Sequence, residues 1–176
     1  ACLILITQFP QVFPNQEDII LNTFPYIDGG ASISRTARPY PSWLIFKPAM
    51  YVTSFLLIKY WIYNRDIIKS LDKNHKNLNK IIFFGVGSAI ALAIHATFLG
   101  IKFDHDLYKL FRRIIMLAFI VFELVAQAYL VSTFYSLKSL ILKFINEKYL
   151  KLKRILVITL IIVAIISLPL VSMPGN

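Results

Sequence analysis

Two polar residues stand one helical turn apart inside a long apolar run. The run, residues 114–135, reads IIMLAFIVFELVAQAYLVSTFY, and it contains Glu123 and Gln127. At a spacing of four they share one face of a helix. A lone acid at the centre of a membrane helix costs at least about 2.5 kcal/mol on insertion scales, so we expect Glu123 to face the interior of a helix bundle, neutral or hydrogen bonded. Two readings remain open: a proton or cation site, or an interhelical hydrogen bond worth about 0.6 kcal/mol.

Two histidines follow near the end of another apolar run, residues 81–100. His95 lies toward the end of that run, and His105 stands between Asp104 and Asp106 just beyond it. Paired histidines can ligate haem or a metal, and aspartates in a loop can hold a weakly bound divalent cation. However, no second apolar run carries a facing histidine. We therefore expect no cofactor and no metal, with His95 bonded to backbone or to Glu123. His95 and Thr97 are the candidate partners of Glu123 from another helix.

A third candidate site is the pair Arg35 and Arg38, in the segment that precedes the first complete apolar run. If this segment turns helically, both guanidinium groups can bind one phosphate or carboxylate. The loop would then bind lipid headgroups or a substrate anion. The alternative is a structured plug, rich in proline and turn formers, that packs on helix ends.

Enzyme motifs of the soluble type are missing from the sequence. It contains no G-x-x-x-x-G-K-[ST], H-E-x-x-H or G-x-S-x-G pattern. Cys2 is the single cysteine, which excludes an intrachain disulfide. We identify no catalytic residue, and the chemistry described so far favours a non-enzymatic protein.

The elements that carry these residues are predicted to be membrane helices. Hydrophobic residues make up 57% of the 176, against roughly 45–50% in soluble domains, and the mean hydropathy is +0.66. The predicted fold is an all-α polytopic transmembrane bundle in one domain, residues 1–176, because each run approaches the roughly 20 residues that span a bilayer. Its predicted parts are four full helices at 43–63, 81–100, 114–135 and 155–173, a partial helix at 1–9, read as the end of a truncated membrane helix, and a loop at 10–42.

A stripe of small residues indicates how one of these helices packs, and an amphipathic pattern indicates where one linker lies. Gly85, Ala89, Ala93 and Thr97 recur every four residues, a stripe that lets a partner helix approach closely. In the linker 138–154, apolar residues at helical spacing predict a partly helical, basic amphipathic segment on the membrane surface. They are Leu140, Ile141, Phe144 and Ile145.

The distribution of Lys and Arg among the linkers predicts which side of the membrane each linker faces. The net charge is +10, and the basic residues sit mostly between the apolar runs, which favours contact with anionic headgroups over nucleic acid. Linkers 64–80 and 138–154 hold five and six Lys or Arg residues, whereas 10–42 and 101–113 hold two and four. The positive-inside rule places the first two in the cytoplasm and the other two on the opposite side.

Residues 24–48, FPYIDGGASISRTARPYPSWLIFKP, resemble the first lumenal loop of the damage-regulated autophagy modulator superfamily. The matching positions are Pro25, Tyr26, Ile27 and Gly30, followed by Pro39 or Pro41. Asp28 departs from the pattern, since the family usually has serine there, and the family has six helices. The resemblance implies a multipass protein of lipid or membrane homeostasis, with this loop outside and the N-terminus inside. It supplies no catalytic residue.

Three functional hypotheses follow. The first is a non-enzymatic integral membrane protein that interacts with lipid or serves as an accessory subunit of a larger complex. The second is a small transporter or proton-coupled protein that uses Glu123 and Gln127. The third is a haem-binding redox subunit.

Overall fold

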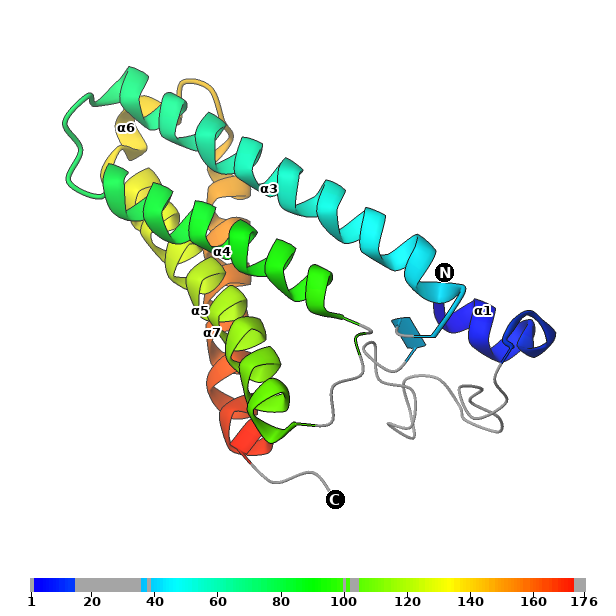
Figure 1. Ribbon diagram of the computed structural model, residues 1–176. Coiled ribbons are helices and arrows are strands. Elements are labelled where there is room, and N and C mark those ends of the chain that lie inside the picture. The colour runs from blue at the N-terminus through cyan, green and yellow to red at the C-terminus, as the bar shows by residue number, and fades with distance from the viewer. Residues whose placement is uncertain (1, 15–35, 38, 100, 102–104, 173–176) are drawn as a thin grey trace. The chain divides into compact units, whose positions relative to one another are not determined.

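The computed structural model describes residues 2–14, 36, 37, 39–99, 101 and 105–172, and every regular element in this part of the chain is a helix (Figure 1). This confirms the predicted all-α class for the described residues. The elements, in chain order, are α1 (Cys2–Gln8), the 3₁₀ turn η1 (Pro10–Val12), α3 (Ser42–Leu71), α4 (Leu78–Phe98), α5 (Asp106–Ser136), α6 (Lys138–Ile141) and α7 (Glu147–Ser172).

The four long helices cover all or most of the four apolar runs, and each extends into a neighbouring linker at one or both ends. Helix α3 runs through Leu71, and α5 begins at Asp106 inside the segment expected to be a loop. Both extensions use residues that a helix tolerates. Asp106 stands in the first turn of α5, where a negative charge favours the helix dipole, and its carboxylate lies 3.3 Å from Lys109 Nζ one turn on.

Two helices, α4 and α5, are long and apolar enough to cross a membrane, judged over the described residues. Helix α5 contains the predicted span 114–135, and α4 contains the predicted span 81–100 up to Phe98. The predicted spans 43–63 and 155–173 lie largely in α3 and α7, which do not meet the same criterion. Lys47 and Lys59 interrupt the apolar run of α3, and α7 begins with a basic stretch.

The linker after α5 is only partly helical. Helix α6 ends at Ile141, and α7 begins at Glu147, so the expected amphipathic face is interrupted by a turn. Ile141 is buried, but Leu140, Phe144 and Ile145 are exposed. The linker is thus partly helical, as predicted, but these four apolar side chains do not lie on one helix. Its place on the membrane surface stays a prediction.

The chain divides into two compact units, each built from parts of several helices. One comprises Leu57–Ala89 and Ala118–Asn176. Its core joins the second half of α3, the first half of α4, most of α5, α6 and α7. The buried residues at its centre are Trp61, Ile68, Ile81, Ala126, Leu130, Phe134, Ile141 and Leu150.

The other unit comprises Ala1–Leu56 and Ile90–Leu117. Tyr51 of α3 and Thr97 of α4 are joined by a 2.9 Å hydrogen bond between their hydroxyls. Lys47 Nζ donates to the Thr97 carbonyl at 3.4 Å, near the end of α4, where a cation favours the helix dipole. Lys47 thus contributes to the packing of α3 against α4 in this unit.

Candidate intramembrane polar site

The first contact of Glu123 is on its own helix. Gln127 Nε2 donates a hydrogen bond to Glu123 Oε1 at 2.9 Å, and both side chains are half-buried. The spacing of four residues places the amide over the carboxyl on one face of α5. The rest of this stretch of α5 is apolar, so the two polar groups satisfy each other where no other polar group of the helix is near.

The second contact comes from α4. Ser88, which is fully buried, has its Oγ 2.7 Å from Glu123 Oε2. The same Oγ lies 2.7 Å from the carbonyl oxygen of Gly85, one turn back on α4. A serine hydroxyl has a single hydrogen, so it can give a full hydrogen bond to one of these oxygens at a time.

Two hydrogen-bonding patterns therefore fit this geometry, and they differ by one proton. If Glu123 is ionised, Ser88 donates to its carboxylate, and the Gly85 carbonyl keeps only its helical partner. If Glu123 is protonated at Oε2, it donates to Ser88 Oγ, and Ser88 donates to Gly85. The second pattern makes both 2.7 Å contacts full hydrogen bonds at once. The two patterns also differ in the direction of the Ser88 hydroxyl, which points to Glu123 in the first and to the Gly85 carbonyl in the second.

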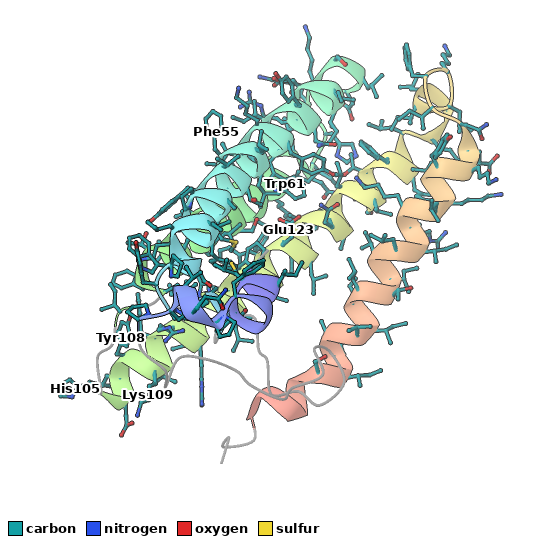
Figure 2. All side chains as sticks on the ribbon, turned by 90° about the vertical axis from the view of Figure 1, so that its right-hand side faces the viewer. Phe55, Trp61, His105, Tyr108, Lys109 and Glu123 are labelled. Carbon is teal, nitrogen blue, oxygen red and sulfur yellow. The ribbon has the colours of Figure 1, made fainter. Side chains whose placement is uncertain are left out.

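Close approach of the helices makes the contact between Ser88 and Glu123 possible. A Cβ at Gly85 would overlap the indole ring of Trp61 on α3, and a Cβ at Gly87 would lie 2.8 Å from Phe122 Cδ2 on α5. The missing side chains let both aromatic rings lie directly against α4. Figure 2 labels Trp61 and Glu123, which approach the same stretch of α4 from α3 and α5.

The sequence anticipated a partner for Glu123 from another helix, but it named His95 and Thr97. The structure assigns Ser88, about two to two and a half turns earlier on α4. His95 is half-buried, its Nδ1 has no hydrogen-bond partner within the described residues, and the side-chain partners described for Glu123 are Ser88 and Gln127. Thr97 donates to the Ala93 carbonyl at 2.9 Å. The stripe that begins at Gly85 was the signal that could have pointed to Ser88, which stands on the neighbouring position of that face.

The small residues at every fourth position of α4 pack partly against other helices of the same chain. Gly85 contacts Trp61 of α3, and Ala89 is fully buried. Ala93 is half-buried. A helix of another protein at this stripe stays a prediction.

The remaining sequence candidates do not form a site in the part of the chain that the structure describes. Arg35, Arg38 and Asp104 lie outside the described residues. His105 and Asp106 are exposed, as Figure 2 shows for His105. Within the described residues, no three His, Cys, Asp or Glu side chains come together in a way that could hold a metal.

Basic residues paired with aromatic rings are a feature that the sequence analysis missed. Lys153 Nζ donates to the Tyr60 hydroxyl at 2.9 Å and lies 5.5 Å from the centre of the Phe134 ring. Lys80 lies 5.3 Å from the Tyr129 ring, and the Arg154 guanidinium lies 5.0 Å from the Tyr135 ring. The pairs join residues far apart in sequence, so no local pattern could have shown them. Such cation–π contacts contribute about 0.5–1 kcal/mol at exposed sites.

An ion pair links α6 to the start of α7. Lys138 Nζ lies 2.8 Å from Glu147 Oε1, and Lys151 Nζ lies 3.4 Å from the same oxygen. The hydrogen bond from Lys138 holds the pKa of the Glu147 carboxyl below its ordinary value, with a second contribution from Lys151. The same hydrogen bond raises the pKa of Lys138.

Comparison with known proteins does not assign this chain to a family. The sequence matches no protein-family model, and neither a curated protein nor a solved structure is similar to it. The function must therefore be argued from the chain's own residues.

Proposed function

We propose that this chain is a non-enzymatic integral membrane protein that interacts with lipid, alone or as an accessory subunit of a larger membrane complex. One observation carries the proposal. In the apolar stretch of α5 only 17% of the residues are buried in the structure, and in that of α4 only 39%. A core helix of a soluble protein is mostly buried, so these exposed apolar faces need an apolar surrounding.

Helices α3 and α7 would complete a polytopic bundle. Helix α7 exposes apolar side chains on several sides, which suits contact with hydrocarbon. They are Ile155, Leu156, Ile158, Leu160, Ile162, Val163, Ile165 and Ile166. Lys47 and Lys59 of α3 can extend to opposite interfaces.

The orientation follows from the linkers. Segments 64–80 and 138–154 would face the cytoplasm, and 10–42 and 101–113 would face the other side. The cation–aromatic pairs of Lys80, Lys153 and Arg154 support an interface near the two basic linkers, because amphipathic side chains gather at headgroup level. The lipid partners would be anionic headgroups. The resemblance of residues 24–48 to the damage-regulated autophagy modulator superfamily is in line with a role in membrane homeostasis.

Membrane extraction tests this proposal, with one exposed position of α5 as the probe. The protein should stay in the membrane pellet through alkaline carbonate and should need detergent for release. Val121 is 49% exposed near the middle of α5. Val121→Lys should lower insertion by about 2.5–3.5 kcal/mol on insertion scales, whereas Val121→Leu should leave it unchanged. A folded, monodisperse protein in buffer without detergent, or a Val121→Lys variant that is more soluble and equally folded, would refute membrane insertion.

A proton-coupled or transport role is the second candidate, and the Ser88–Glu123–Gln127 hydrogen bonds favour it. Ser88 can hydrogen bond the Glu123 carboxyl both with and without a proton on it, so the same contacts fit either form of a carboxyl that exchanges a proton. Proton flux into liposomes that contain the purified protein tests this role. Flux that is lost in Glu123→Gln but kept in Glu147→Gln, the same substitution outside the apolar stretch of α5, would support it, and absence of flux above protein-free liposomes would exclude it.

A further inference from the structure

A groove between α5 and α7 has a volume of about 350 Å³, within the size range of small-molecule sites. Both helices contribute to it in antiparallel register. Tyr135, Val131 and Ala128 line it from α5, opposite Arg154, Ile158 and Ile161 from α7. In both views the end of α5 lies beside the beginning of α7, where α6 connects them (Figures 1 and 2).

The lining changes from polar to apolar along the groove. Arg154, Tyr135 and Ser132 form one end, and the walls beyond them are aliphatic. Seven residues separate Arg154 from Ile161 on α7, which corresponds to about 10 Å along the helix. The groove, about 10 Å long in all, thus has a cationic, hydrogen-bonding mouth at one end and apolar walls beyond it.

The charge at the mouth is uncompensated. The guanidinium of Arg154 lies 5.0 Å from the centre of the Tyr135 ring, which holds it at this end of the groove. Among the described residues Arg154 forms no ion pair, and the nearby carboxylate of Glu147 is engaged by Lys138 and Lys151. None of the residues that line the groove is acidic. An anion from outside the chain would therefore meet a positive charge with free donors.

We propose that this groove binds one anionic phospholipid, with its phosphate at Arg154 and an acyl chain along Val131, Ile158 and Ile161. The polarity of the groove matches the polarity of such a lipid, and its mouth belongs to the basic linker 138–154. If that linker faces the cytoplasm, the site opens toward the leaflet that carries anionic lipids. The inference rests on the proposed membrane location, and it adds a specific lipid class and position to it.

Photocrosslinking of the wild-type protein tests the position of the lipid. Purified protein in phosphatidylcholine nanodiscs would receive a trace of phosphatidylglycerol that carries a diazirine in its acyl chain. Crosslinks should concentrate on Val131, Ile158 and Ile161, and a matched phosphatidylcholine probe should label them much less. Even labelling of the exposed faces of α5 and α7, or equal labelling by both probes, would overturn the proposal.

Matched variants test the recognition. Arg154→Gln should weaken retention of phosphatidylglycerol, measured by native mass spectrometry, about tenfold, the order expected for loss of a hydrogen bond to a charged group. Lys148→Gln removes the same charge from an exposed position of α7 outside the groove and should have little effect. Ile158→Trp, which fills the groove, should also reduce retention, whereas Ile162→Trp should not. Equal losses in Arg154→Gln and Lys148→Gln would show a general charge effect and refute the site.

The two proposals fail differently. Wild-type protein that resists carbonate extraction but shows no preference for the anionic probe would refute the lipid site alone. Protein that is released from membranes would refute the membrane location as well.

Discussion

The hydroxyl of Ser88 lies 2.7 Å from the carboxyl of Glu123, and this contact ties α4 to α5 through a buried polar group. Ser88 lies three residues after Gly85 on α4, and Gly85 packs against Trp61 of α3. Three helices thus meet at one turn of α4. This hydrogen bond depends on the close packing beside it, because a larger distance between α4 and α5 would take the Ser88 hydroxyl out of reach of the Glu123 carboxyl.

Removal of the Ser88 hydroxyl should destabilise the packing of α4 on α5. Ser88→Ala should lower the free energy of unfolding in detergent by about 0.6–1.7 kcal/mol, the range measured for hydrogen bonds between membrane helices. Ser167→Ala is the control, since Ser167 Oγ bonds the Val163 carbonyl of its own helix at 2.7 Å and no second helix. Equal effects of the two substitutions would mean that the bond from Ser88 to Glu123 contributes nothing.

Glu123 substitutions separate a structural role from a functional one. Glu123→Gln keeps an acceptor and adds donors, so it should change the stability little, whereas Glu123→Leu should cost about 1–2 kcal/mol. If the second candidate function is correct, Glu123→Gln should fold normally and lose proton flux. Unfolding by denaturant in detergent measures the stability, and a Glu123→Leu variant as stable as the wild type would contradict the structural role.

The glycines of α4 should differ in their tolerance of alanine. Gly85→Ala should destabilise by about 1–3 kcal/mol, because the new methyl group would overlap the buried Trp61 indole. Gly87→Ala gains the same helix propensity but meets Phe122, which is only half-buried, so it should cost less. Thermal unfolding in detergent would rank them. Trp61→Ala removes the ring, so the double variant Gly85→Ala, Trp61→Ala should lose less stability than the sum of the two single losses. Additive losses would contradict the overlap as the cause.

The ion pair between Lys138 and Glu147 should give stability a pH dependence at both extremes. The lowered pKa of Glu147 means that its contribution is present above the ordinary carboxylate pKa and is lost as the pH falls through the lowered value. The raised pKa of Lys138 means that its contribution is present below the ordinary lysine pKa and is lost as the pH rises through the raised value. Glu147→Gln should flatten the acid side of the unfolding profile, and added salt should weaken the effect because both groups are exposed. An acid limb identical to that of the wild type would contradict this assignment.

Labelling from outside the cell tests the topology. Ser70 is exposed at the end of α3, in the linker predicted to face the cytoplasm. In a Cys2→Ser background, Ser70→Cys should resist an impermeant thiol reagent in intact cells and react after permeabilisation. His105→Cys, in the exposed segment on the opposite side, should react in intact cells. The reverse pattern would invert the predicted orientation.

The sequence by itself determined the local features of this protein. Its apolar runs determined where the long helices lie, because a run of that length forms a helix from its own backbone hydrogen bonds. The spacing of Glu123 and Gln127 placed them on one face, and their side chains are joined at 2.9 Å. These features depend on residues within one or two turns of each other, so the helical period is enough to predict them.

The tertiary structure decided which distant residues meet. Ser88 rather than His95 contacts Glu123 because the register of α4 against α5 depends on how Gly85 and Gly87 accommodate Trp61 and Phe122. Likewise, Arg154 meets Tyr135 only because α7 returns antiparallel to α5 after the turn that follows α6. Helix periodicity fixes the face on which a residue lies, but a shift of one turn along a neighbouring helix changes its partner, and such a shift depends on side-chain packing between helices.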